Sequence, residues 1–471
     1  MAVTDIVFIF TFLPLSLALY YLVKKNCREY ILLFVSLLFY ACGSPEYFSL
    51  LLLSLIVNLS FGWLIGSCKG AQRLRTCCLI LGIVYDFSIL GYYKYRDFVL
   101  LTVGRIAHFE VTMSNLILPL GLSFFVFKAV SYLVDAYCGK IEVKKNPVQV
   151  ALYLSFFAQI QSGPISRAED MQLVKNISTF NNLADGLFRF MIGFEKKILI
   201  ADTLSNITKE TFAALPQNMS GAYAWLGAVC YSLQLLFDFS GYSDMAIGMS
   251  KMFGYKCPEN FNYPYMAESV SKFWRKWHIT LGAWFRDYVY IPLGGSRVNS
   301  KFRLYLNLLI VWAFTGIWHG SSWRFVFWGL AYFVLIAFEK STCLPDKLKT
   351  KVSKCLYRVL TLLAINFLWV IFGADVLRRV IEYIKVMVFF PANSLADFRT
   401  SFLIKDNIVF ILAAIVLSFP IIPRLANKFK RGRVTSFIGN FLLVTINSML
   451  FIWAVSYVVA GQNNPFAYAN F

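Results

Sequence analysis

The residue in this sequence with the clearest capacity for chemistry is His319. The chain contains three histidines, and His319 follows fourteen residues without a formal charge (305–318) and precedes a second apolar run (325–338). An ionisable side chain in such a segment costs at least a few kcal/mol inside a membrane, so it usually has a functional reason to be there. Imidazole titrates near neutrality and can accept and return a proton within one turnover. A packed histidine that bonds a neighbouring carbonyl group is the structural alternative, and the sequence leaves both open.

A second histidine, His278, lies in an amphipathic stretch. Aromatic and apolar residues recur at steps of three and four and share one helical face with it, namely Trp274, Trp277, Leu281, Phe285 and Tyr288. The other face carries Lys272, Arg275, Lys276 and Arg286. The pattern predicts one helix of about twenty residues that lies in a membrane interface or dips into the membrane. Ser269 or Ser271 would cap its start, and it would end before Pro292.

The positive charges near His278 have two interpretations. Arg275 and Lys276 would suit the phosphates of an acyl carrier such as coenzyme A, because guanidinium and ammonium groups donate well to phosphate oxygens. Attachment to lipid headgroups is the commoner use of a cationic helix with an aromatic face. The third histidine, His108, lies between helices in a segment without a comparable pattern.

Two carboxylates, Asp238 and Asp244, lie in the long apolar segment 222–252. They are six residues apart, so they share a helical face only if the helix bends at Gly241. We predict that both pair with basic residues near His278 and thereby support the site. The candidate partners are Arg275, Lys276 and Arg286. The structural alternative is that one of the two carboxylates caps a broken helix.

The composition is that of a polytopic membrane protein. Hydrophobic residues make up 58% of the chain, and apolar runs near the length of a membrane span, about twenty residues, recur throughout. The formal charge is +20, but the basic residues cluster in short loops between apolar runs. That is the positive-inside pattern and not a nucleic-acid surface. The histidines and the ten cysteines are scattered, which predicts no metal site.

The apolar runs are expected to form one transmembrane domain. The first run, Ile6 to Val23, is too long for a cleavable signal and should remain as a span. Loop charges predict that both termini lie outside the cytoplasm. The domain would cover residues 1–471, with N-terminal helices (1–115), a core with both site histidines (116–342) and C-terminal helices (343–471).

Two segments depart from simple spans. Residues 148–165 contain several amide side chains next to Gly163 and Pro164. Irregular backbone at membrane depth must be covered by protein or line a wet cavity, so we expect a chamber wall here, although a helix end at a loop fits as well. Residues 188–200 carry three charges in their middle and are expected to lie flat.

Several longer motifs together resemble the membrane-bound O-acyltransferases. They are FDFSGYSDMAIGMSKMFGY (237–255), NFNYPY (260–265), FWRKWHITLGAWFRDYVYIPLGGSR (273–297) and TGIWHG (315–320). Weaker matches are LPLGLSFFVFKAVSYLVDAY (118–137), QSGPI (161–165) and PFAYANF (465–471). The likeness is to the branch with the alginate and peptidoglycan O-acetyltransferases. The D-alanine-transferring relatives that serve teichoic acid share the two histidines but lack the full IPLGGSR extension.

This resemblance implies an all-α polytopic membrane protein, a bundle of roughly 11 to 13 helices around a central chamber, with re-entrant and interfacial helices. It also implies that His319 is the catalytic histidine and that His278 is the second histidine of the site. Contacts to substrate or coenzyme A are expected from Arg275, Lys276, Trp277, Trp318 and Asn262.

The activity implied is movement of an acetyl group from cytoplasmic acetyl-CoA across the membrane towards the hydroxyls of a cell-surface polysaccharide. His319 would act as a general base or carry the acyl group transiently, and His278 would position the thioester carbonyl or the acceptor. Trp277, Trp318 and Phe285 would line an apolar passage in which hydrolysis is suppressed. The resemblance further implies an extracytoplasmic SGNH-like partner and a bacterial cytoplasmic membrane. Acetyl-CoA would be a substrate, with no permanently bound cofactor.

Three alternatives remain at this point. D-alanyl transfer from a carrier-protein thioester to teichoic acid would use the same two histidines. A transporter or flippase would also contain broken helices and polar residues inside the membrane. However, the sequence has no paired halves with matching interruptions, and its polar residues concentrate around two histidines. The third alternative is a scaffold that recruits an outer enzyme.

Overall fold

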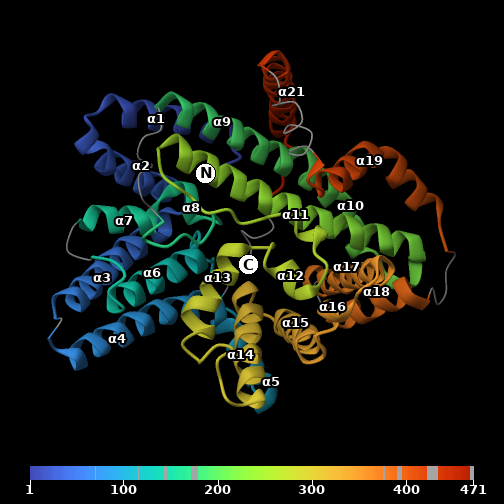
Figure 1. Cartoon of the computed structure of the whole chain (residues 1–471), viewed down its shortest axis with the longest axis horizontal. Coiled ribbons are helices and arrows are strands. Elements are labelled where there is room, and N and C mark those ends of the chain that lie inside the picture. The colour runs from blue at the N-terminus through green and yellow to red at the C-terminus, as the bar shows by residue number, and fades with distance from the viewer. Residues whose placement is uncertain are drawn as a thin grey trace. The chain divides into compact units, whose positions relative to one another are not determined.

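The structure is a computed structural model of the chain, and the described residues form helices with no strand among them (Figure 1). They fall into two compact units. Unit 1 comprises Met1–Phe190 and Met245–Pro258, and unit 2 comprises Met191–Asp244 and the described residues from Glu259 onward. The described residues are 1–68, 70–114, 116–142, 146–170, 179–374, 377–389, 395–421 and 433–466, without the side chains of 179 and 433–437.

Unit 1 is built from apolar helices. α3, α4 and α6 pack against one another, and α2 packs on α7. Nearly every side chain of α6 is buried, including that of Lys128, so α6 is the centre of this unit. The helices are α1 (Leu13–Leu22), α2 (Arg28–Gly43), α3 (Phe48–Ser67), α4 (Gln72–Leu90), α5 (Arg96–Ala107), α6 (Leu122–Tyr137) and α7 (Pro147–Ser155).

The predicted break in residues 148–165 is present in unit 1. Phe156 leaves the helical conformation (φ −53°, ψ 115°), and only the single turn α8 (Phe157–Ile160) follows it. Gln159 holds the break together, because its Oε1 accepts hydrogen bonds from Lys128 Nζ at 3.2 Å and from Ser166 Oγ at 2.6 Å. The break is therefore confirmed, and its role as a chamber wall stays a prediction.

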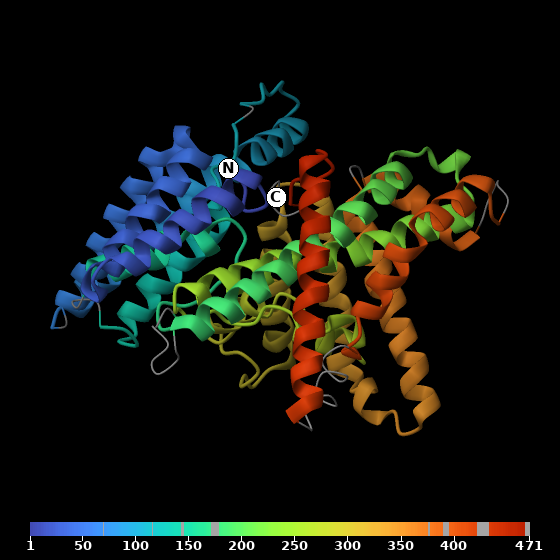
Figure 2. The same cartoon turned by 90° about the horizontal axis from the view of Figure 1, so that it is seen from above.

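Unit 2 holds the second half of the chain, and two long helices, α9 (Thr179–Glu195) and α11 (Gly221–Met252), continue from one unit into the other. Figure 2 shows α21 along its whole length. The remaining helices are α10 (Thr203–Ala213), α12 (Val270–Trp274), α13 (Ile279–Phe285), α14 (Lys301–His319), α15 (Trp323–Thr342), α16 (Leu344–Lys347), α17 (Lys351–Gly373), α18 (Leu377–Phe389), α19 (Phe398–Leu417) and α21 (Arg433–Val459).

α14 and α15 make the most extensive helix contact of unit 2. A Cβ atom at Gly329 would lie 2.4 Å from the carbonyl oxygen of Trp312, and one at Gly316 would lie 2.4 Å from that of Phe325. Both distances are far below van der Waals contact, so the two backbones approach this closely only because these positions are glycine. The contact fixes the end of α14, where His319 lies.

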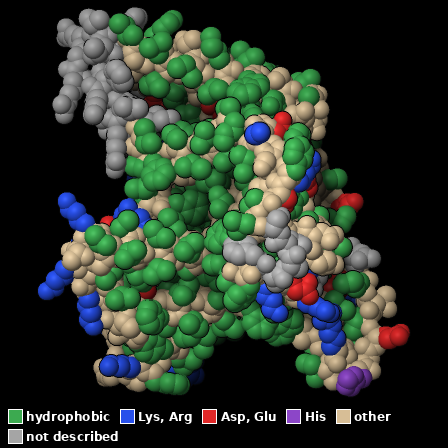
Figure 3. Space-filling model, turned by 90° about the vertical axis from the view of Figure 1, so that its right-hand side faces the viewer, with side chains coloured by type: hydrophobic (Ala, Val, Ile, Leu, Met, Phe, Trp, Pro, Cys, Tyr) green, Lys and Arg blue, Asp and Glu red, His purple; other side chains and the backbone are tan. Residues whose placement is uncertain are grey.

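The long helices have the length and composition of membrane spans. Large hydrophobic side chains are exposed on them, and hydrophobic side chains cover most of the face in Figure 3. Apolar surface of this extent suits lipid. The expected all-α polytopic membrane protein is confirmed, whereas its division at residues 115 and 342 stays a prediction. Six candidate spans occur among the described residues: Pro45–Ser67, Gln72–Ala107, Trp323–Thr342, Lys351–Gly373, Phe398–Leu417 and Ile438–Val459.

Candidate active site

The stretch around His278 is not one helix. α12 ends at Trp274, α13 begins at Ile279, and His278 between them has the left-handed conformation (φ 44°, ψ 54°). The prediction of a continuous helix of about twenty residues is therefore wrong. The start is confirmed, because the Ser269 side chain accepts a hydrogen bond from the backbone N–H of Lys272 at 3.2 Å.

The turn at His278 is held by the NFNYPY segment. The backbone N–H of Ile279 donates to the carbonyl oxygen of Asn260 at 2.9 Å, and that of Asn262 donates to Lys276 at 3.0 Å. These bonds satisfy backbone groups that a continuous helix would have paired internally. A non-glycine residue with positive φ is uncommon and persists only where the surroundings enforce it. The neighbouring segment thus places the imidazole.

Asn260 also directs the His278 ring. Its Oδ1 lies 3.1 Å from His278 Nδ1 and accepts from Thr280 N at 3.2 Å and Thr280 Oγ1 at 2.8 Å, while its Nδ2 donates to Ser243 Oγ at 3.2 Å. Since Oδ1 is the acceptor, Nδ1 carries the ring proton and Nε2 of the neutral ring has a lone pair. Nε2 has no hydrogen-bond partner among the described residues, so it is available to a substrate.

His319 is the last residue of α14 and lies among aromatic rings. Its ring centroid is 5.1 Å from that of Trp318, 5.0 Å from that of Trp328 in α15 and 5.4 Å from that of Phe372 in α17. The side chain is buried. Rings packed edge to face fix the plane of an imidazole and keep bulk water away from it.

Trp318 contacts both histidines. The centroid of its ring lies 5.8 Å from that of His278 and 5.1 Å from that of His319. Phe239 of α11 also packs on His278, at 4.6 Å. The structure therefore brings the two predicted histidines to one buried place in unit 2, one from a turn and the other from a helix end. Their chemical roles stay predictions.

Trp277, which directly precedes His278, is fully buried. Its ring packs on Phe261, Phe273 and Trp369 at centroid distances of 5.1, 5.5 and 4.9 Å. These contacts describe a packed support for the turn. A place on a substrate passage stays a prediction for Trp277, Trp318 and Phe285.

The cations near His278 differ in their pairing. Lys272 bonds Glu268 at 2.7 Å, and this hydrogen bond holds the pKa of that carboxyl below its ordinary value. Arg275 is exposed and Lys276 is half-buried. Neither forms an ion pair with a residue that the structure describes, which leaves their charge available to a ligand such as the predicted phosphates.

Asp238 and Asp244 do not pair with the predicted cations. Lys197 Nζ lies 2.8 Å from Asp238 Oδ1, and Lys196 Nζ lies 2.6 Å from Asp244 Oδ2. Both lysines belong to the π-helix Lys196–Asp202 that continues α9. The proposed partners were wrong because the sequence does not reveal that this segment runs beside α11. Support of the site by the two carboxylates stays a prediction.

Arg286 and Gly241 also differ from the predictions. Arg286 bonds its neighbour Asp287 at 2.6 Å and not a carboxylate of α11. α11 continues as a single helix through Gly241. A Cβ at this position would lie 2.7 Å from the carbonyl oxygen of Gly193, so the glycine permits close helix packing instead of a helix break.

Comparison with known proteins identifies the family. The sequence model of the membrane-bound O-acyltransferase family matches residues 105–377, which is more than half of the chain. The chain belongs to the membrane-bound O-acyltransferase family. It is 37% identical over 420 residues to the probable alginate O-acetylase of Pseudomonas aeruginosa, covering 88% of this chain and 80% of that protein.

Two further relatives of this membrane-bound O-acyltransferase differ in coverage. The peptidoglycan O-acetyltransferase of Helicobacter pylori is 34% identical over 453 residues, which cover 88% of this chain and 85% of that protein. The teichoic acid D-alanyltransferase of Bacillus subtilis is 31% identical over 242 residues, which cover 48% of this chain and 61% of that protein. The protein is therefore a multi-pass membrane enzyme of the O-acyltransferase class, and the transporter and scaffold alternatives fall away.

Sequence reasoning missed two residues that hold the segment around His278. Glu339 of α15 accepts from the backbone N–H groups of Val270 and Ser271, at 2.7 and 2.9 Å, and from Tyr357 Oη at 2.9 Å. A carboxylate at the start of α12 is favourable because helix N-termini carry partial positive charge. The signal was an acidic residue at the end of an apolar helix. The other missed residue is Asn260, which lies two positions before the predicted Asn262.

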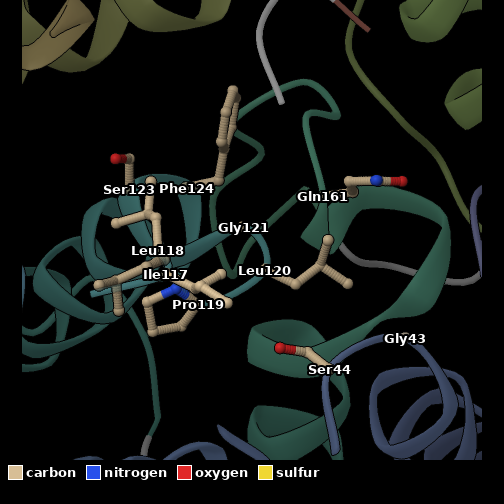
Figure 4. Close-up of a pocket in the computed structure, with 11 residues that line it drawn as sticks. Gly43, Ser44, Ile117, Leu118, Pro119, Leu120, Gly121, Ser123, Phe124 and Gln161 are labelled. Atoms are coloured by element: carbon tan, nitrogen blue, oxygen red, sulfur yellow. The ribbon is translucent and has the colours of Figure 1, made fainter. Parts of the chain in front are cut away.

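A separate cavity of about 160 Å³ lies in unit 1 (Figure 4). It is lined by Gly43, Ser44, residues 117–124 and Gln161. No histidine and none of the predicted site residues is among them. Among the described residues there is also no group of three or more His, Cys, Asp or Glu side chains that could hold a metal ion.

Proposed function

We propose that this O-acyltransferase moves acetyl groups from acetyl-CoA towards the hydroxyls of a cell-surface polysaccharide, with a partner that completes the transfer. The O-acetylases of alginate and peptidoglycan match 88% of the chain, whereas the D-alanyltransferase matches 48%. The observation that carries the proposal is the pair of buried histidines in contact with Trp318, one of which has its tautomer set by Asn260.

In this proposal His319 is the general base. It removes the proton of the acceptor hydroxyl as the hydroxyl oxygen attacks the thioester carbonyl carbon. The carbon–sulfur bond then breaks, and the coenzyme A thiolate leaves and takes the proton back from the imidazolium. The products are an acetyl ester and free coenzyme A. Aromatic surroundings favour this outcome because they keep out the water that would hydrolyse the thioester.

His278 orients the acceptor in the same proposal. With the proton on Nδ1, the neutral ring presents a lone pair at Nε2 and accepts a hydrogen bond from a hydroxyl. It cannot donate from Nε2 to a thioester carbonyl in that state. This supports the acceptor as the ligand of His278, and leaves the carbonyl to other groups.

Arg275 and Lys276 bind the phosphates of the donor. Both lie in the turn that carries His278 and have no ion pair among the described residues, and their charges suit phosphate oxygens. Asn262 lies in the segment that pairs with this turn.

The test of the function is the release of free coenzyme A from acetyl-CoA by the purified protein in lipid, with oligouronate or peptidoglycan fragments as acceptors. His319→Ala is expected to lower turnover by about 10²- to 10⁴-fold, the usual contribution of a general base. His108→Ala, at an exposed site, is the matched control. Full activity of His319→Ala would remove the central claim.

Two other results of this assay redirect the proposal. One equivalent of coenzyme A released rapidly without acceptor would make His319 an acyl carrier instead of a base. No release from wild type, together with turnover of a D-alanyl carrier-protein thioester, would replace acetyl by D-alanyl transfer.

We also propose that the enzyme lies in the bacterial cytoplasmic membrane with both termini outside, and that an SGNH-like partner completes the transfer there. The loop charges support the orientation, and the motifs support the partner. A cysteine introduced at Gln462, which is exposed, should react with an impermeant thiol reagent in intact cells. Reaction only after permeabilisation would reverse the orientation.

The SGNH-like protein should copurify with the tagged full chain. Transfer of acetyl to the polymer by the purified enzyme alone would contradict the need for this partner.

A further inference from the structure

A buried ion cluster joins α11 to the π-helix Lys196–Asp202. Lys197 Nζ lies 2.6 Å from Asp202 Oδ1 and 2.8 Å from Asp238 Oδ1, and all three side chains are at most 4% exposed. Removing charges from water costs several kcal/mol per ion, so such clusters contribute little net stability. Their better-supported use is to specify one arrangement of the elements that carry them.

Residues 464–466, here called the C-terminal segment, lie directly on this cluster. Asn464 N–H donates to Asp202 Oδ2 at 3.2 Å, and Lys197 Nζ donates to the carbonyl oxygen of Pro465 at 3.4 Å. The same Nζ lies 4.8 Å from the ring centroid of Phe466, within cation–π range. Phe466 is buried. The segment therefore shields the cluster and supplies polar partners to two of its members.

The cluster and His278 use adjacent faces of one turn of α11. Asp238 and Tyr242 are four residues apart and face the C-terminal segment, because Asp238 bonds Lys197 and Tyr242 packs on Phe466 at 4.9 Å. Phe239 and Ser243 lie on the next face, about 100° around the helix. Phe239 packs on His278, and Ser243 accepts the hydrogen bond of Asn260 described above.

Rotation of α11 therefore moves both faces together. With side-chain tips about 6 Å from the helix axis, a rotation of about 20° displaces them by about 2 Å. A misplacement of about 1 Å can cost about 100-fold in rate. Next to the site, the contact between Phe466, Tyr242 and the ion cluster opposes this rotation, together with the Lys196–Asp244 ion pair.

We propose that Phe466 is a positioning residue for His278, and that the C-terminal segment acts through the Lys197 cluster and α11. The effect on turnover rests on the proposed function, whereas the effect on the His278 ring does not. The experiment therefore measures both quantities on the full chain in lipid.

The ring is measured by its reactivity with diethyl pyrocarbonate, mapped by peptide mass spectrometry. The exposed His108 serves as the internal reference for reagent concentration. Phe466→Ala is expected to speed the labelling of the buried His278 about tenfold relative to His108 and to lower kcat with little change in the KM for acetyl-CoA. Phe466→Tyr keeps the ring and should stay within about twofold of wild type.

The matched control is Phe212→Ala. Phe212 also packs a ring on α11, against Tyr231 at 5.1 Å, but away from the turn that holds His278. It should leave His278 labelling unchanged. If Phe466→Ala does not yield folded protein, Phe466→Leu removes the ring and keeps most of the apolar volume.

Each outcome decides a different point. Labelling of His278 within twofold of wild type in folded Phe466→Ala or Phe466→Leu would overturn the inference. An equal change in the labelling of His278 by Phe212→Ala and Phe466→Ala would also overturn the inference. Faster labelling of His278 with unchanged turnover would uphold the inference and remove His278 from the proposed function.

Discussion

His278 and His319 are equally buried but are held in different ways. His278 lies in a left-handed turn and is bonded by Asn260, whose own partners are fixed. His319 ends a helix and lies among the rings of Trp318 and other aromatic residues. A directed hydrogen bond prescribes which nitrogen of the His278 ring carries the proton. In the proposed function, His278 orients the acceptor and His319 transfers the proton.

The backbone segments that carry the two histidines are also held in different ways. The turn at His278 depends on polar contacts to its backbone and ring, whereas the end of α14 depends on glycines that let two backbones meet. Changes in polar groups should therefore act on one histidine and changes in packing volume on the other.

The largest effect is expected from Gly329→Ala. Its Cβ would lie 2.4 Å from a backbone oxygen of α14, so α14 must shift and carry His319 with it. A displacement of about 1 Å predicts a loss of about 100-fold in kcat, measured by coenzyme A release. Gly282→Ala in α13 is the control, because its nearest atom would be 3.8 Å away. Equal losses of kcat in both variants would contradict the distinction between a helix end held by close packing and a turn held by hydrogen bonds.

Asn260→Ala is expected to have the next largest effect. It removes the acceptor that sets the His278 tautomer, and groups that orient a site residue in this way are worth about 10- to 100-fold in activity. Asn260→Asp keeps an acceptor and should retain more activity. Asn262→Ala should cost less than Asn260→Ala, since the contact of Asn262 to the turn is through its backbone. The reverse order would return the site role to Asn262.

A further prediction tests whether cations in the turn at His278 bind the phosphates of the donor. Arg275→Gln and Lys276→Gln should each raise the KM for acetyl-CoA about tenfold, as expected for the loss of a hydrogen bond to a charged group. Acetyl-pantetheine carries no phosphate and should show no such increase. Lys272→Gln, whose cation is already paired with Glu268, is the control. An equal KM increase for both donors would exclude phosphate binding, and a dependence on anionic lipid would favour headgroup attachment.

The smallest effect is expected from Ser269→Ala. This cap of α12 should contribute about 1 kcal/mol to stability, visible as a lower Tm with kcat little changed. Ser271→Ala is the control, because the cap bond belongs to Ser269. A larger loss in the Ser271 variant would assign the cap to the other serine.

Much of the site was predictable because its signals are local. A lone ionisable residue between apolar runs marks His319, since only a protein interior accommodates it in a membrane. The amides beside Gly163 and Pro164 marked the break after Ser155. Ser269 as a cap depends only on its neighbours in the chain.

The partners of these residues were decided by tertiary structure. The aromatic and apolar periodicity in the sequence continues through the turn at His278, so the pattern cannot reveal the break between α12 and α13. Hydrogen bonds from residues 260–262 outweigh the helical preference there. The pairing of Asp238 with Lys197 likewise depends on which helices pack together. The sequence by itself therefore determined the membrane class, the family motifs and the two histidines. Only the tertiary structure decided what holds each imidazole, because hydrogen bonds between distant segments depend on distances that composition and spacing do not encode.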